Sequence, residues 1–214
     1  MREELELAKK SLFEIRDTET KYTSTAQYYY AHIAYLQKNY ETSLTYFRKI
    51  EKHPKFAAII PYYITQILFE QEKYEELIAY GPGVLDSANA KRSNEIARLL
   101  GEAHYRTENY KEALPYLKRY HENKSSIKEA DLYQMGYVHY KLSEFPEAVK
   151  WFVDCITAGD SLKQYAYYYL GECYIRLSNK KSARAAFKNA SRGMHAGIAE
   201  DALFNFAKVS YELS

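Results

Sequence analysis

Small residues recur along this chain at intervals of 34 to 36 residues, each directly after a larger apolar or aromatic residue. These six residues form the first series: Ala31, Thr65, Gly101, Gly136, Gly171 and Ala207. Two helices approach closely only where one of them contributes a small side chain. A period of this length corresponds to one pair of helices per repeat. The period therefore predicts an all-α chain that is built from stacked helical hairpins.

A second series runs in parallel with the first at the same spacing. Its members are Ala8, Ser43, Leu77, Ala113, Ala148 and Ala183. Large residues such as Phe47, Phe152 and Phe187 stand four positions after most of them. Spacings of three, four and seven place residues on one face of a helix. Because a large residue fills the space beside a close contact, we expect the two series to meet inside each hairpin.

Short polar segments separate the predicted helices and force them to be antiparallel neighbours. Lys38-Asn39 and Ser178-Asn179 are two examples. One second helix contains Gly81-Pro82-Gly83. In a helix interior Pro costs roughly 3 kcal/mol and Gly about 1 kcal/mol, so this sequence predicts a break or kink near Tyr80. Pro115 predicts a milder disturbance of the same kind.

The residues in three successive blocks resemble the tetratricopeptide repeat family. The matching residues include Leu100-Gly101, Tyr105, Ala113 and Leu117, then Met135-Gly136, Tyr140, Ala148 and Phe152, then Leu170-Gly171, Tyr174, Ala183 and Phe187. The resemblance implies a right-handed superhelical solenoid of about twelve helices. It also implies a non-catalytic, protein- or peptide-binding scaffold whose first helices line a concave face.

The two series place the repeats along a single array that spans residues 1–214. We expect a lone second helix in 1–22, full repeats at about 23–55, 56–90, 91–125, 126–160 and 161–195, and a lone first helix in 196–214. A solenoid normally finishes in a polar capping element, whereas the last segment carries Phe204, Phe206, Val209 and Tyr211. The chain is therefore expected to be a fragment of a longer array.

Tyrosine is the outlier of the composition, with 24 copies against a single Trp. Its ring covers apolar area while its hydroxyl remains a hydrogen-bonding group. The resemblance assigns the following residues to the concave, peptide-binding face: Tyr28, His32, Tyr35, Tyr62, Gln66, Phe69, Arg98, Glu102, Tyr105, Tyr133, Tyr137, Tyr140, Tyr168 and Glu172. The same rings also suit packing between neighbouring first helices, and both interpretations stay open.

Other function classes receive little support from the sequence. The net charge of +2 gives no electrostatic field that favours binding of nucleic acid. The pentatricopeptide family, which reads RNA, has small polar residues at certain positions of its first helices, and this chain has mostly Tyr there. No run approaches the ~20 apolar residues of a membrane span. His104 and His139 occupy equivalent slots and are interpreted as packing residues, not metal ligands. Cys155 and Cys173 are interpreted as buried small hydrophobes, and whether they pair stays open. We expect no catalysis, no cofactor and no metal.

The sequence therefore predicts a scaffold that binds a protein or peptide and does not itself insert into a membrane. Two alternatives stay open: an assembly scaffold, including one made of copies of this chain, and a docking domain of a larger protein with a separate catalytic part. The stretch Asp201–Tyr211 is similar to repeats of bacterial cell-envelope adaptors. This similarity favours a periplasmic or outer-membrane-associated location without fixing it.

Overall fold

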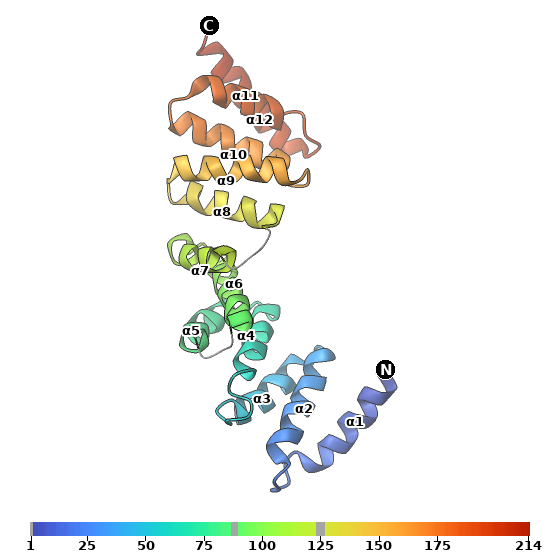
Figure 1. Ribbon diagram of the computed structural model, residues 1–214. Helices are drawn as coiled ribbons and strands as arrows, with labels where there is room; N and C mark the ends of the chain where they lie inside the picture. The colour runs from blue at the N-terminus through green and yellow to red at the C-terminus, as the bar shows by residue number, and fades with distance from the viewer. Residues whose placement is uncertain (1, 87–89, 123–126) are drawn as a thin grey trace. The chain divides into compact units, whose positions relative to one another are not determined.

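The computed structural model describes residues 2–86, 90–122 and 127–214, and these residues form twelve helices and no strand (Figure 1). The predicted all-α fold of antiparallel helix pairs is confirmed. The chain divides into two compact units, Met1–Asn109 and Tyr110–Ser214. No helix in the described ranges is both long and apolar enough to cross a membrane.

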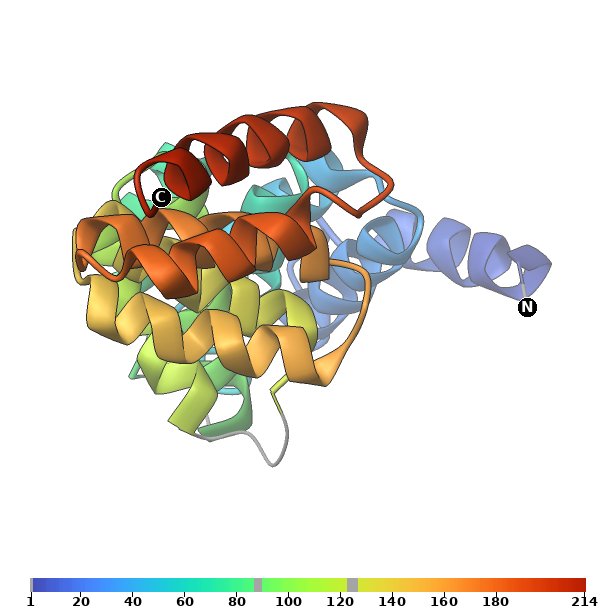
Figure 2. The same ribbon diagram turned by 90° about the horizontal axis from the view of Figure 1, so that it is seen from above.

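The helices of the first unit are α1 (Arg2–Ile15), α2 (Thr23–Leu36), α3 (Tyr40–Ile50), α4 (Ile60–Glu70), α5 (Tyr74–Val84) and α6 (Ala90–Arg106). Those of the second unit are α7 (Tyr110–Glu122), α8 (Glu129–Lys141), α9 (Phe145–Ala158), α10 (Lys163–Arg176), α11 (Lys180–Ala190) and α12 (Ala196–Tyr211). In the second unit α8 to α12 stack in chain order, each against the next (Figures 1 and 2). The ion pair between Lys180 and Glu212, at 3.0 Å, ties α11 to the end of α12.

The turns between first and second helices share one backbone conformation. A single residue in each turn has a positive φ of 56–61°, although none of them is glycine: Lys38, Glu72, Glu108, Ser143 and Ser178. The next N–H reaches back to a carbonyl five residues earlier, as from Asn179 to Tyr174 at 2.8 Å. This is the Schellman arrangement that ends a helix. It reverses the chain within three residues, which explains why hairpins such as α8–α9 and α10–α11 are tight.

The first and second series meet inside the hairpins, as predicted. A Cβ added to Gly136 of α8 would lie 2.8 Å from ring atoms of Phe152 in α9. One added to Gly171 of α10 would lie 2.7 Å from the ring of Phe187 in α11. In the α2–α3 hairpin the buried hydroxyl of Ser43 donates to the Ala31 carbonyl at 2.9 Å. The small residues therefore form notches that receive the large residue of the partner helix.

The prediction of a break near Tyr80 was wrong. Helix α5 continues through Gly81, Pro82 and Gly83 and ends at Val84. Gly81 is buried, and a Cβ there would lie 2.7 Å from Leu100 of α6. Tertiary packing therefore uses Gly81 as a notch. Helix α7 likewise continues through Pro115 to Glu122, so no break occurs there.

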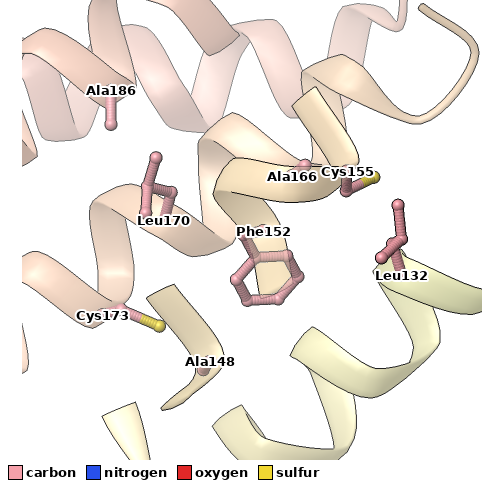
Figure 3. Close-up of a cluster of buried hydrophobic side chains, with 8 residues drawn as sticks. All are labelled: Leu132, Ala148, Phe152, Cys155, Ala166, Leu170, Cys173 and Ala186. Atoms are coloured by element: carbon pink, nitrogen blue, oxygen red, sulfur yellow. The ribbon is translucent and has the colours of Figure 1, made fainter. Parts of the chain in front are cut away.

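The buried cluster of the second unit joins four of its helices (Figure 3). Leu132 comes from α8, while Ala148, Phe152 and Cys155 come from α9. Ala166, Leu170 and Cys173 come from α10, and Ala186 comes from α11. Because one core extends across successive hairpins, the first helices α8 and α10 are held rigidly beside one another.

Candidate protein-binding face

The fourteen residues assigned to the concave face lie on α2, α4, α6, α8 and α10, and every one of them is half-buried. We call this set the first-helix face. Nine of the residues belong to the first unit and five to the second: Tyr133, Tyr137, Tyr140, Tyr168 and Glu172. Half-burial means that each side chain is held by its neighbours and still presents part of its surface.

In the first unit, the rings of the face are fixed by stacking. Tyr28 stacks on Phe56, with ring centroids 4.6 Å apart and planes only 3° from parallel. Tyr63 stacks on Phe47 at 5.2 Å, and its ring also lies 5.2 Å from His32. It lies 5.3 Å from Tyr35 as well. Tyr63 thus connects the rings of α2 to the core, a role that the sequence analysis missed.

Tyr169 has the same role in the second unit. Its centroid lies 5.1 Å from those of both Tyr137 and Tyr140, and its ring stacks on Phe152 at 5.9 Å. Tyr133 is 6.2 Å from Tyr137 and 5.9 Å from Phe152. The sequence signal for these connecting residues is an aromatic doublet, Tyr62-Tyr63 and Tyr168-Tyr169, at equivalent positions of two repeats.

Burial shifts the pKa values of several residues on the face so that their uncharged forms are favoured. It raises the pKa of Tyr28 to about 12, with Tyr63 a further cause. Burial also raises the pKa values of Tyr140 and Tyr168, and in both cases the nearby Glu172 carboxyl adds to the effect. The Glu172 pKa is itself raised by burial, against the opposing charges of Arg176 and Lys208. The phenol groups therefore remain protonated at neutral pH and can donate hydrogen bonds.

The charged members of the face on α6 are paired along their own helix. Arg98 lies 3.0 Å from Glu95, and Arg106 lies 2.8 Å from Glu102. Pairs of this spacing are neighbours on a helix surface and contribute only a few tenths of a kcal/mol. The α6 part of the face is therefore polar, and its charges are balanced by ion pairs within the helix. The α2 and α8 parts are mainly aromatic.

His104, His139 and the two cysteines are buried. His139 is buried, and its Nδ1 lies 2.6 Å from a Glu144 carboxylate oxygen. Both thiols are free and buried. Burial, with Glu129 nearby, raises the pKa of Cys155 to about 11, and burial, with Glu172 nearby, raises that of Cys173 to about 12. Among the described residues no group of three or more His, Cys, Asp or Glu side chains could hold a metal ion.

Two pockets lie outside the first-helix face. One, of about 290 Å³, lies beside Gln164, whose amide donates to the Ala190 and His195 carbonyls and accepts from the His195 N–H. The other, of about 300 Å³, lies between α11 and α12. The exposed cations Lys181, Arg184 and Lys188 line this second pocket.

Comparison with known proteins finds matches to family models in two segments of the chain. One tetratricopeptide repeat family model matches residues 71–126, and a second matches residues 165–191. No curated protein matches the chain.

Several solved structures have the same fold. YrrB, described as a TPR protein with an unusual peptide-binding site, is 20% identical with a TM-score of 0.70, covering 95% of this chain and 98% of its own. MamA from Desulfovibrio magneticus RS-1 is 16% identical with a TM-score of 0.61, covering 78% of this chain and 92% of its own. A tetratricopeptide repeat protein from Parabacteroides merdae is 14% identical with a TM-score of 0.58, and the match covers 96% of this chain and 93% of that protein's chain.

The family models, the notched hairpins and the fold of these structures agree with one another. Their agreement supports a general role in protein interaction, because proteins of this fold generally act as non-catalytic scaffolds. Residues 71–126 and 165–191 thus match models of the tetratricopeptide repeat family, and the chain has the fold of solved tetratricopeptide repeat proteins.

Proposed function

We propose that this scaffold binds a peptide or an extended protein segment on the first-helix face. The observation that carries the proposal is the half-burial of all fourteen residues on the first helices. A ring that is already packed loses little conformational entropy when a partner covers its exposed edge. In each unit the face thus offers preorganised apolar area.

The polar groups of the face complement a peptide backbone. The protonated hydroxyls of Tyr140 and Tyr168 are available as donors to peptide carbonyls. Glu172, half-buried beside them, supplies an acceptor. The similarity to YrrB supports the same proposal, because that protein is described as having an unusual peptide-binding site.

Removing two rings of the second unit tests the proposal. Peptides selected by display against the purified chain should lose about 30-fold or more in affinity for the variant Tyr133→Ala/Tyr168→Ala, because a well-buried anchor contributes on the order of 1–2 kcal/mol. Isothermal titration calorimetry measures this loss. The milder variant Tyr133→Phe/Tyr168→Phe keeps both rings and should show only the smaller effect of the hydroxyls.

Tyr22→Ala provides the matched control, because Tyr22 is 59% exposed and lies outside the face. Circular dichroism establishes that each variant is folded. Equal affinities for the wild type and the folded Tyr133→Ala/Tyr168→Ala variant would rule out the face as the binding site.

Three further features stay predictions from the sequence. They are the single array with the repeat boundaries given above, a docking role beside a catalytic part, and a cell-envelope location. Exclusion of nucleic acid as a partner rests on the net charge of +2.

A further inference from the structure

The second-unit part of the first-helix face consists of tyrosine rings on two neighbouring helices. On α8 the rings of Tyr133, Tyr137 and Tyr140 share one helix face, because they are four and three positions apart. Tyr168 of α10 stands 35 residues after Tyr133. Side chains of the two helices are in contact, since the ring centroid of Tyr169 lies 6.3 Å from that of Tyr133 and 5.1 Å from that of Tyr137. A ligand that lies across α8 and α10 therefore meets rings on both.

The hydroxyls of this part of the face favour a ligand that accepts hydrogen bonds. Burial, with the nearby Glu172 carboxyl, raises the pKa values of Tyr140 and Tyr168, so both phenols keep their proton at neutral pH. Neither hydroxyl is hydrogen-bonded to another residue within the described part of the chain. Both are therefore free to donate to a carbonyl that is placed on them.

Two exposed cations border the rings where the two helices end. Lys141 is the last residue of α8, and Arg176 is the last residue of α10. The Nζ atom of Lys141 lies 5.5 Å from the ring centroid of Tyr137. The charge of Arg176 acts on Tyr140 and Glu172, since it opposes the rise of both pKa values. This end of the face therefore complements a ligand that carries acidic side chains.

A proline-rich backbone matches such a set of donors. Each proline has a carbonyl but no N–H. In the polyproline II conformation there are no internal hydrogen bonds, so the carbonyls remain able to accept. A helical peptide has already used its carbonyls within the helix, and a β-strand peptide brings one N–H for each carbonyl. Of these three backbones, polyproline II complements the hydroxyls of Tyr140 and Tyr168 best.

The spacing of such a backbone also matches the spacing of packed helices. Polyproline II has three residues per turn and rises about 3.1 Å per residue, so residues three apart lie on one side about 9 Å from each other. The axes of packed helices are about 8–10 Å apart. A chain with a proline at every third position, lying across α8 and α10, can therefore place one proline over Tyr133 and the next over Tyr168.

We propose that the second-unit part of the first-helix face binds proline-rich segments in the polyproline II conformation that have acidic residues beside the prolines. This inference rests on the proposed peptide-binding function and names the class of peptide. The tyrosine rings cover the proline rings, Tyr140 and Tyr168 donate to backbone carbonyls, and Lys141 and Arg176 pair with the acidic residues. Aromatic surfaces recognise proline-rich segments in the same way in other folds, where the stiff ligand loses little entropy on binding.

Fluorescently labelled peptides test the inference in anisotropy titrations with the full chain. The probe has nine prolines between pairs of Asp residues. One matched peptide replaces the prolines by Gly-Ser repeats, and another replaces the Asp residues by Lys. The probe should bind at least about tenfold more tightly than the Gly-Ser peptide, because it is preorganised. It should bind about two- to fivefold more tightly than the Lys peptide, as expected for exposed ion pairs.

Conservative variants locate the contacts without removing a ring. Tyr140→Phe and Tyr168→Phe should each weaken binding of the probe about two- to tenfold, the range for loss of one hydrogen bond. Lys141→Glu should weaken binding of the probe and strengthen binding of the Lys peptide. Tyr22→Phe makes the same change as the two face variants at an exposed position outside the face, and it should bind like the wild type. Circular dichroism establishes that each variant is folded.

Equal affinities for the probe and the Gly-Ser peptide would overturn the inference, as would unchanged binding of the probe to folded Tyr140→Phe and Tyr168→Phe. The display-selected peptides separate this failure from a failure of the proposed function. If those peptides lack proline and still lose affinity for Tyr133→Ala/Tyr168→Ala, the face binds peptides of another class. If they bind that variant as tightly as the wild type, the proposed function itself fails.

Discussion

Replacing Phe152 by alanine lowers the free energy of unfolding by about 3–5 kcal/mol, the range for truncating a buried aromatic side chain. Phe152 is fully buried and occupies the notch at Gly136. Its ring is stacked on Tyr169 and lies 5.9 Å from Tyr133. Its loss would leave a cavity between α8, α9 and α10 that the rigid hairpins cannot close (Figure 3).

Urea denaturation followed by circular dichroism measures this effect. Val153→Ala is the matched control, because the neighbouring side chain is 40% exposed and its truncation should change stability by no more than about 0.5 kcal/mol. If Phe152→Ala were as stable as this control, the ring would not be a core element and the notch would have no energetic role.

Adding one methyl group at a notch glycine destabilises the protein, whereas adding it at an open glycine stabilises it. Gly136→Ala should lower the free energy of unfolding by about 1–3 kcal/mol, because overpacking forces the Phe152 ring or the backbone to move. Gly171→Ala should lower the free energy of unfolding in the same way, because its methyl group would meet the Phe187 ring. Gly83→Ala should raise stability by about 0.5–1 kcal/mol, because its Cβ meets nothing within 4 Å and alanine is the better helix former.

The comparison separates packing from helix propensity, since all three substitutions are glycine to alanine inside a helix. Thermal and urea unfolding of the three variants provide the measurement. A double variant, Gly136→Ala/Phe152→Leu, should be more stable than the sum of its single effects predicts, because the smaller side chain makes room for the methyl group. Stabilisation by Gly136→Ala alone would contradict the close approach of α8 and α9.

The repeated hairpins were predictable from sequence because their cause is local and periodic. The small residues at Gly136 and Gly171 and the large ones at Phe152 and Phe187 recur at fixed spacing, and close packing needs that pairing. The behaviour of α5 was not predictable in this way. Intrinsic propensity argues against a helix through Gly81, but the packing of Leu100 into that position overrides it.

The first-helix face was predictable only as a set of positions. Helical spacing identifies which residues share a face, and it led to Tyr137 and Tyr140 directly. It does not give the direction of each ring, which depends on the neighbouring helix. Tyr63 and Tyr169 each follow a predicted face residue by one position. For this reason they emerged as the residues that anchor the face only once the packed helices were seen.

Ring-carbon NMR of the tyrosines tests the proposed binding face most directly. A display-selected peptide is titrated into the chain with labelled tyrosine rings, and each resonance is assigned by single substitution. If the face binds the peptide, the resonances of Tyr133, Tyr137, Tyr140 and Tyr168 shift, while that of the exposed Tyr22 does not. Shifts confined to tyrosines outside the face, such as Tyr22 and Tyr116, would contradict the proposal.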